Sequence, residues 1–316
     1  MSAVNYLENS GAHDMATRSQ LTGKIVVSIS AICAVAIVLV VVLIMLDIVV
    51  GGAGTLNWRF LSNAPSQGMT SGGIFPAIFG TFVLVTLMSL VGIPVGTITA
   101  IYLCEYARAE SVLSRAIRFA VNTLAGIPAI VFGLFGLGFF IQFVGKGIDN
   151  VFNGGQLLWG QPCILWASFT MALLTLPVVI VSVEEAIRAV PRELREASLA
   201  LGATKWQTIR KVVIPNSLTG IMTGGILAVS RGAGEVAPIL FVGAAYFLPH
   251  LPTKLTDQFM ELGYHIYIMT TQSTDVEATR PIQFATTLVL LLLTFLLNFS
   301  AIFLRYRLRK RMTVHA

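Results

Sequence analysis

Six long apolar segments divide the chain, and each is long enough to cross a lipid bilayer. A helix needs about 20 consecutive, mostly apolar residues to span the hydrocarbon layer. Charged residues make up only 11% of the 316 residues, whereas soluble domains carry about 25%. These observations predict an all-α integral membrane protein with six transmembrane helices. The expected spans are residues 25–50, 74–103, 119–144, 163–183, 218–245 and 281–304.

The segments before the second span have distinct compositions. Residues 1–24 are polar, and we expect them to form a poorly ordered cytoplasmic tail. The run 25–50 is too long for the apolar core of a signal peptide and lacks a small-residue cleavage site, so we expect a retained first transmembrane helix. Residues 51–73 are rich in Gly, Ser and Asn and are expected to form a periplasmic loop.

Several expected spans contain proline and many glycines. Internal proline is tolerated in a membrane when neighbouring helices cover the freed backbone groups, and small residues allow close contact between helices. Kinked, glycine-rich helices suit a pathway that moves. The prolines in question are Pro94, Pro128, Pro177 and Pro238.

Lysine and arginine are distributed unevenly between the two sides of this topology. With the N-terminus inside, sixteen lie in inner segments and four in outer segments. Because Lys and Arg concentrate in cytoplasmic loops, we expect both termini, the basic tail 305–316 and the loop 184–216 in the cytoplasm. The net charge of +6 then reflects topology, and no nucleic-acid partner is expected. The inner residues are Arg18, Lys24, Arg108, Arg115, Arg118, Arg188, Arg192, Arg195, Lys205, Arg210, Lys211, Arg305, Arg307, Arg309, Lys310 and Arg311, and the outer ones are Arg59, Lys146, Lys254 and Arg280.

The loop 184–216 contains a polar stretch that predicts two short helices with a break. Gly202 suits the left-handed position that ends a helix. Thr204 and Gln207 have the spacing of a capping box, which would start the second helix. Pro215 is expected to interrupt that helix before the next span. Apolar residues recur at helical spacing in both parts, so each short helix has an apolar face for a partner protein.

The same stretch resembles the EAA loop of ABC importer permeases. It carries Glu196, Ala197, Ser198 and Gly202 at the family spacing, followed after nine further residues by Val-Val-Ile-Pro at 212–215. In that family the loop forms a coupling helix that sits in a cleft of the cytosolic ATPase. The residues to which the resemblance assigns ATPase coupling are Glu196, Ala197, Leu201 and Gly202.

One expected span carries opposite charges deep in its middle. Arg231 would lie about 20 Å into a helix that begins near residue 218, close to the middle of the membrane. An arginine there costs about 2.5–3.5 kcal/mol on insertion scales, so it faces a protein interior or a water-filled path. Glu235 lies four residues on and can pair with it across one helix face. Since a guanidinium matches an oxyanion with a planar fork of donors, we interpret Arg231 and Glu235 as part of a substrate pathway; a purely structural ion pair is the alternative.

Three further segments carry a wider resemblance to the PstA-type permease subunit of phosphate importers. Residues 72–81 and 126–136 are similar to segments of the family's core domain. Residues 231–241 read Arg-Gly-Ala-Gly-Glu-Val-Ala-Pro-Ile-Leu-Phe and resemble the family's Arg-x-x-Gly-Glu-Thr-Ala-Pro-Leu-Leu-Phe, with Val236 in place of the usual Thr. The resemblance covers about residues 55–304 and implies the type I ABC importer permease fold, with a permease core of five helices at 74–304.

This resemblance also implies a function and a set of partners. The chain would be an inner-membrane permease subunit that imports inorganic phosphate, with Arg231 contacting the anion and Glu235 positioning Arg231. A related PstC-type permease would form a heterodimer with it, a PstB-type ATPase dimer would lie below, and a periplasmic phosphate-binding protein would deliver the anion. Membrane lipid would surround the spans.

Two kinds of chemistry are not expected of the chain itself. No Gly-x-x-x-x-Gly-Lys-(Ser/Thr) run occurs, so the chain is not predicted to be an enzyme, and ATP and Mg²⁺ would be cofactors of the partner ATPase only. The spacing of Cys33, Cys104 and Cys163 gives neither a metal site nor a disulfide framework, and we infer no metal.

Three other functions stay open from the residues alone. A permease for another oxyanion would share the fold. A secondary transporter driven by protons through Glu235 would often show internal inverted repeats, and we find none. A membrane scaffold would need no charged pair at mid-depth.

The outer segment 246–280 is long and holds several acidic residues. We expect a short amphipathic helix between residues 250 and 274, lying on the outer surface. A solvated loop and a docking surface for the binding protein are equally open interpretations.

Overall fold

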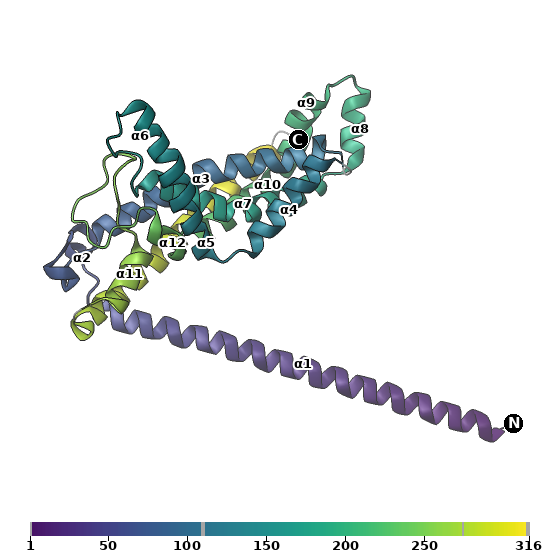
Figure 1. Ribbon diagram of the computed structural model, residues 1–316. Helices are drawn as coiled ribbons and strands as arrows, with labels where there is room; N and C mark the ends of the chain where they lie inside the picture. Colours follow the sequence, from purple (N-terminus) through teal and green to yellow (C-terminus); the bar gives the residue numbers. More distant parts are fainter. Residues whose placement is uncertain (1, 109–110, 274, 314–316) are drawn as a thin grey trace.

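The computed structural model describes residues 2–108, 111–273 and 275–313, with side chains placed between residues 23 and 307 of these ranges. Helices form most of the described chain (Figure 1). The segments η2, η3 and η4 are π-helical, η1 and η5 are 3₁₀ turns, and one short antiparallel hairpin joins β1 to β2. In chain order the elements are α1 (Ser2–Ala53), α2 (Trp58–Ser62), β1 (Pro65–Ser66), η1 (Gln67–Met69), β2 (Ser71–Gly72), α3 (Phe75–Ile101), η2 (Tyr102–Tyr106), α4 (Val112–Gly126), α5 (Ala129–Phe135), η3 (Gly136–Gly145), α6 (Lys146–Phe152), α7 (Ile164–Arg188), α8 (Arg192–Ala200), α9 (Lys205–Thr208), η4 (Ile209–Val213), α10 (Ile214–Gly232), η5 (Ala237–Phe241), α11 (Leu262–Thr271) and α12 (Val276–Thr313).

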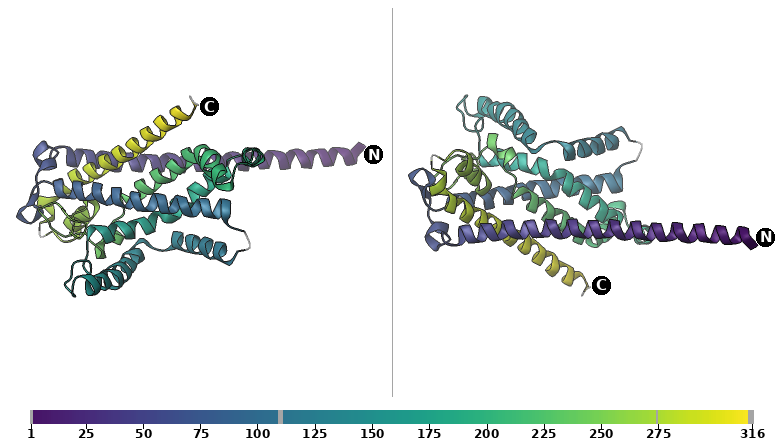
Figure 2. Two further views of the ribbon diagram at one scale, coloured as in Figure 1. Left: turned by 90° about the horizontal axis from the view of Figure 1, so that it is seen from above. Right: turned by 90° about the horizontal axis from the view of Figure 1, so that it is seen from below.

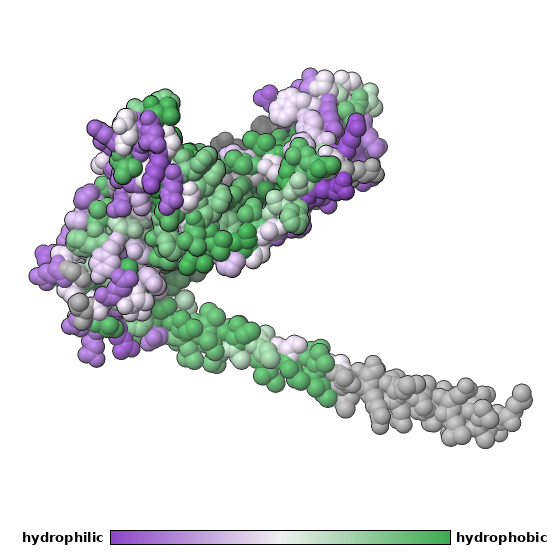
Figure 3. All heavy atoms as spheres, in the orientation of Figure 1, coloured by the Kyte–Doolittle hydropathy of each residue, from purple (hydrophilic) through white to green (hydrophobic). Residues whose placement is uncertain are grey.

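Six helical segments of the described chain are long and apolar enough to cross a membrane, which confirms the predicted fold class. Figure 3 shows apolar side chains over the middle of the bundle and polar side chains gathered at its two ends. One of these ends carries α8 and α9, which we call the elbow (Figure 1). The six segments are Gly23–Ala53, Phe75–Tyr106, Ala129–Phe152, Ile164–Arg188, Lys205–Gly232 and Val276–Arg307.

Helix α7 lies at the centre of the bundle, packed between α3 and α10. Glycines allow the close approach that the sequence predicts. A Cβ atom at Gly96 on α3 would lie 2.6 Å from Val179 of α7, and one at Gly220 on α10 would lie 2.2 Å from the Cβ of Ala186. Both distances are too short for real atoms, so larger residues would push these helices apart.

The expected single span at 119–144 is wrong, because the helix is interrupted before Pro128. Ile127 has an extended backbone (φ −79°, ψ 133°), as steric clash with a following proline favours. The break separates α4, which carries Arg118 on one face, from the true span that runs from Ala129 through η3 to the end of α6. The hydrophobic run that began at Phe119 therefore belongs to two different elements.

The expected span at 218–245 is also wrong at both of its ends. Its helix begins at Lys205 and continues through η4 into α10, so Pro215 does not interrupt it. The wider π-helical turn just before Pro215 accommodates a residue that lacks an N–H and would clash with a regular preceding turn. At the other end the helix stops at Gly232, and the chain continues as an irregular segment into the 3₁₀ turn η5.

The N-terminal segment is more regular than expected. Residues 2–24, predicted to be poorly ordered, form the first turns of α1. An existing helix extends at low cost, because each added residue gains one hydrogen bond. The contact between α1 and α12 is close at Gly52, where a Cβ would lie 2.8 Å from the backbone of Ala285. From there α1 extends away from the bundle, and its start, like the end of α12, points toward the elbow end (Figures 1 and 2). The last three residues of the expected basic tail 305–316 lie outside the described chain.

The end of the bundle opposite the elbow is closed by α2, the β1–β2 hairpin and α11. The helix expected between residues 250 and 274 exists as α11, but it is packed into the bundle rather than lying on the surface, since Leu262, His265 and Ile268 are buried. Glu261 caps this helix with both carboxylate oxygens, which accept hydrogen bonds from the backbone N–H groups of Gly263 (2.8 Å) and Tyr264 (2.6 Å). Burial raises the pKa of Glu261 to about 7.

We expect Glu261→Gln to remove part of the pH dependence of stability. The folded-state pKa of about 7 lies above the ordinary value of 4.5, so the contribution of this carboxyl to stability is complete below pH 4.5 and is lost as the pH rises to about 7. For a rise of about 2.5 pKa units, at about 1.4 kcal/mol per unit, the loss is on the order of 3–4 kcal/mol. Burial lowers the pKa of His265 to about 4, which gives the opposite trend between pH 4 and 6.5, but that histidine is present in both proteins.

Thermal unfolding of both proteins in detergent, followed from pH 5 to pH 8, measures this effect. The unfolding temperature of the wild type should fall relative to that of Glu261→Gln across this range. Parallel pH profiles for the two proteins would contradict the assignment of a destabilised buried carboxylate.

Candidate functional site

Arg231 lies on the last turn of α10 and lines a pocket of about 320 Å³. The rest of the pocket is formed by α4, α5 and α7, and most of its lining is apolar. Arg231 shares it with two neutral polar residues, Asn122 from α4 and Ser182 from α7. A guanidinium, an amide and a hydroxyl are side chains that donate hydrogen bonds to an anion.

The neighbours of Arg231 locate it near mid-depth of the bundle, as predicted. A Cβ atom on the adjacent Gly232 would lie 2.4 Å from the sulfur of Met88 and 3.8 Å from Thr175. Met88 is midway along α3 and Thr175 is midway along α7. Arg231 therefore sits about halfway between the two polar ends of the bundle.

The predicted pairing of Arg231 with Glu235 is confirmed, with 3.4 Å between Nε and Oε1. The expected reason, a shared helix face, is wrong, since the helix ends between the two residues. The side chains are 45% and 25% exposed, so both reach open space. Irregular backbone at membrane depth is tolerated where it is buried in protein or lines a water-filled cavity. The end of α10 satisfies this rule, because it lies beside the pocket that Arg231 lines.

Two contacts hold this helix end in place. Ser230 donates to the amide oxygen of Asn298 on α12 at 2.6 Å. On the other side of the break η5 packs on α5, where a Cβ at Gly133 would lie 2.6 Å from the carbonyl oxygen of Pro238. Val236, which replaces the family's usual threonine, contacts Gly263 of α11 and does not line the pocket. That replacement therefore leaves the walls of the pocket unchanged.

The elbow has the local structure that the sequence predicts. Gly202 has φ +83°, the left-handed conformation that ends α8. Thr204 and Gln207 form the predicted capping box at the start of α9. Ser198 and Thr208 share a hydrogen bond of 3.0 Å between their hydroxyl oxygens, which joins the two short helices. The elbow is thus a compact unit with a fixed angle.

The predicted coupling residues lie on the outside of the elbow. No residue of α8 is buried, and both Glu196 and Ala197 are exposed. Leu201 is 89% exposed, a large apolar side chain at the tip of a polar end. These residues do not meet Arg231, which lies at mid-depth. The structure therefore separates two candidate sites, one at the pocket and one on the elbow.

Sequence reasoning missed the contact that fastens the elbow to the bundle. Arg195 on α8 pairs with Glu105 on η2, with 3.1 Å between Nη2 and Oε1. The same guanidinium donates to the backbone carbonyls of Ile187 and Val190 at 2.7 and 2.5 Å. In the sequence Arg195 contributes only to the charge asymmetry that predicts topology, and its place directly before Glu196 is the local feature that relates it to the elbow.

A second missed contact joins α4 to the end of α7. Arg118 Nη1 lies 2.9 and 3.2 Å from the two carboxylate oxygens of Glu184. Arg188 approaches the same carboxylate at 3.3 Å. Glu184 thus lies between two guanidinium groups at the elbow end of the bundle.

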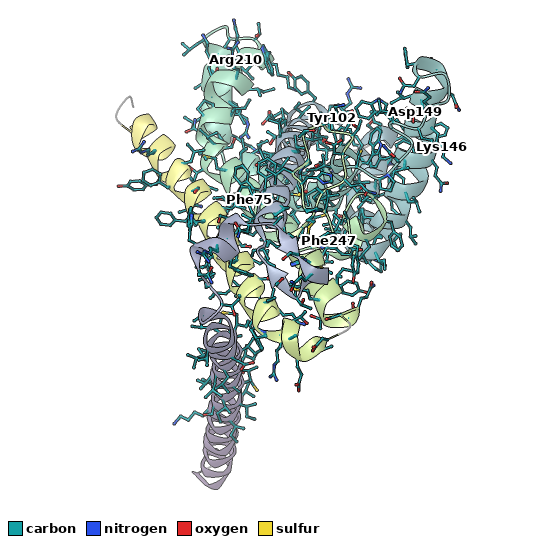
Figure 4. The ribbon with its side chains drawn as sticks, turned by 90° about the vertical axis from the view of Figure 1, so that its left-hand side faces the viewer. Phe75, Tyr102, Lys146, Asp149, Arg210 and Phe247 are labelled. Atoms are coloured by element: carbon teal, nitrogen blue, oxygen red, sulfur yellow. The ribbon has the colours of Figure 1, made fainter. Side chains whose placement is uncertain are left out.

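Other charged residues lie away from both candidate sites. Figure 4 places Lys146 and Asp149 together on α6, on the opposite side of the molecule from Arg210 of the segment that follows the elbow. Asp149 is buried and accepts hydrogen bonds from the backbone N–H groups of Leu158, Trp159 and Gly160, so it shapes the loop after α6. Among the residues that the structure describes, no three His, Cys, Asp or Glu side chains gather in a way that could hold a metal ion.

Known proteins with similar sequences share most of this chain. Residues 92–314 match the family described as binding-protein-dependent transport system inner membrane component. The probable ABC transporter permease protein YqgI of Bacillus subtilis is 30% identical over 310 residues, which cover 94% of this chain and 99% of the relative. The phosphate transport system permease protein PstA 1 of Mycobacterium tuberculosis is 38% identical over 170 residues. That match covers 54% of this chain and about half, 51%, of the relative.

A solved structure supports the fold. A chain of the bacterial alginate ABC transporter, crystallised with an alginate-pentasaccharide-bound periplasmic protein, superposes with a TM-score of 0.56 at 17% identity. The superposition covers 81% of this chain and 85% of that one. The family match and the long match to YqgI together carry the conclusion that this chain belongs to the family of binding-protein-dependent transport system inner membrane components and is a transport subunit of the ABC permease type.

Proposed function

We propose that the chain is the transmembrane permease subunit of an ATP-driven importer that carries inorganic phosphate into the cell. The observation that carries the proposal is the guanidinium of Arg231, which lines a pocket at mid-depth where α10 ends. A planar fork of donors suits a tetrahedral oxyanion, and Glu235 offsets part of the charge so that the anion can leave. Relatives that are 31–38% identical are phosphate transport system permease proteins of the PstA type, which supports phosphate as the anion.

The proposed mechanism is alternating access with partners that supply the energy. A related permease completes the transmembrane pathway, and a periplasmic binding protein delivers phosphate to its outer mouth. A cytosolic ATPase dimer, which holds ATP and Mg²⁺, closes on ATP binding and pushes on the elbow of this chain. The spans then open outward, and hydrolysis returns the Arg231 pocket to the inside. This arrangement requires both termini and the elbow in the cytoplasm.

Uptake of radiolabelled phosphate by proteoliposomes tests the proposal. The liposomes contain the complete importer and ATP, and the binding protein is added outside. We expect uptake that needs ATP, persists when an uncoupler collapses the proton gradient, and resists a hundredfold excess of sulfate. Loss of uptake with the uncoupler would identify an ion-coupled secondary transporter, and loss with sulfate would identify a permease for a different oxyanion.

Gly202→Val is expected to weaken docking of the ATPase on the elbow. A β-branched residue strongly disfavours the φ of +83° found here, so the angle between α8 and α9 must change. We expect about tenfold less ATPase to co-purify with the variant, with the chain still inserted in the membrane. Gly154→Val is the matched control, because Gly154 also has positive φ (+58°) and open space around it but lies after α6. Equal recovery of the ATPase with both variants would exclude a coupling role for the elbow.

A further inference from the structure

The Arg231 pocket continues toward the elbow end of the bundle. A second, smaller pocket of about 80 Å³ shares three wall residues with the first, namely Val121, Asn122 and Val181. Its own end is lined by Arg118 and Glu184. The two pockets therefore adjoin between α4 and α7, one lined by Arg231 at mid-depth and the other by Arg118 and Glu184 near the elbow.

The charges at this second position do not cancel. Glu184 is 13% exposed and accepts from both Arg118 and Arg188, which are 40% and 61% exposed. One carboxylate with two guanidinium groups leaves a net charge of +1. A guanidinium has five N–H donors, and the bonds of Arg118 to Glu184 and to the carbonyl of Leu103 do not use all of them. The open end of Arg118 in this pocket can therefore bind an anion, and Arg188, on the other side of Glu184, adds positive charge from the neighbouring pocket.

Asn122 lies between the two charged positions. It follows Arg118 by four residues on α4, so the two side chains share one face of that helix. Asn122 lines both pockets, and its amide can donate to an oxyanion without adding charge. An anion that leaves Arg231 thus meets a neutral donor and then a second cationic group.

We propose that Arg118 and Arg188, held around Glu184, form a second anion station that receives phosphate from Arg231 and releases it to the cytosol. This proposal rests on the phosphate-import function proposed above. Glu184 has the role here that is proposed for Glu235 at mid-depth. It offsets part of the positive charge, so that the anion can dissociate. Two weak stations in series allow passage, because conduction needs binding that is favourable yet readily reversed.

If phosphate leaves through this second anion station, phosphate inside the vesicle should occupy the station and inhibit uptake. Initial rates of radiolabelled phosphate uptake are measured in proteoliposomes of the complete importer that contain ATP and a series of unlabelled phosphate concentrations. Glu184→Gln leaves both arginines uncompensated, so the internal phosphate concentration that halves the rate should fall about tenfold. Arg118→Gln removes one cation and should raise that concentration about tenfold, whereas Arg118→Lys keeps the charge and should change it less than threefold.

A matched control and a competing role sharpen the test. Arg115→Gln changes an exposed arginine one turn earlier on the same helix and should leave the half-inhibiting concentration unchanged. Arg118 and Glu184 could instead only fasten α4 to α7. In that case their variants lower the uptake rate measured in the absence of internal phosphate, and the half-inhibiting concentration keeps its wild-type value. That result would overturn the proposed second station. Arg231→Gln separates the two proposals. Normal uptake in that variant contradicts the proposed pathway itself, whereas lost uptake with unaltered inhibition in the Arg118 and Glu184 variants removes the second station alone.

Discussion

Arg231→Gln is expected to reduce ATP-driven phosphate uptake at least about a hundredfold while the chain inserts and assembles normally. Arg231 is the one charged residue in the lining of the mid-depth pocket. Glutamine removes the charge and the planar fork but keeps much of the volume. A hydrogen bond to a charged group contributes about 1.5–3 kcal/mol, so loss of two such bonds to the anion exceeds the roughly 2.8 kcal/mol that corresponds to a hundredfold change. Uptake of radiolabelled phosphate, with the amount of chain in the membrane measured in parallel, tests this result.

Three further variants separate the effect of the charge of Arg231, the effect of its donor geometry, and the general effect of removing a cation. Arg231→Lys keeps the charge without the fork, and we expect about a tenfold loss. Glu235→Gln leaves Arg231 unpaired, so phosphate should be held more tightly and the maximal uptake rate should fall. Arg210→Gln removes an exposed cation of η4 that does not line the pocket (Figure 4 labels Arg210), and it should transport normally. Wild-type uptake in Arg231→Gln would leave the chain as a scaffold or move the pathway elsewhere.

Hydrophobicity alone predicted the number of spans and the class of fold, because the requirement for about 20 apolar residues is strict in a bilayer. It did not locate the breaks. The run at 119–144 looks continuous by composition, yet Pro128 forces Ile127 out of the helical region and divides it. The run at 218–245 is also long and mostly apolar, and its helix stops at Gly232 against Met88 and Thr175. Backbone geometry and packing at single residues decide where such helices break. Hydropathy averaged over a window of residues does not contain this information.

The candidate sites were predictable only where their parts are close in sequence. Arg231 and Glu235 are four residues apart, and the capping box of Thr204 spans three, so local spacing was enough. The Arg118–Glu184 pair joins residues 66 apart, and the Arg195–Glu105 pair joins residues 90 apart. Nothing in one sequence says which of many charged residues will meet across such distances. The packing of α4 against α7 brings the first pair together, and the bonds of Arg195 to the backbone at the end of α7 accompany the second.

The contact between Arg195 and Glu105 leads to the second large expected effect. Arg195→Ala should uncouple ATP hydrolysis from transport. Since α8 buries no residue, this guanidinium is one of its few side-chain attachments, and the Ser198–Thr208 bond joins α8 only to α9. Arg195 is 19% exposed and bonds both to Glu105 on η2 and to the backbone carbonyls of Ile187, near the end of α7, and Val190, just after it. Without it the elbow can turn when the ATPase closes, and the movement is not passed to the spans.

We expect the ATPase to co-purify with Arg195→Ala at the wild-type level, because the exposed face with Leu201 is unchanged. The phosphate transported per ATP hydrolysed should fall at least about tenfold. Glu105→Gln keeps the carbonyl bonds of Arg195 and should give a smaller loss, and the double variant should be no worse than Arg195→Ala, since the two side chains act through one contact. Arg192→Ala, an exposed arginine on the same helix, is the control. An unchanged ratio of transport to hydrolysis in Arg195→Ala would mean that force reaches the spans along the continuous helix from Lys205 to Gly232 instead, and that α8 serves docking only.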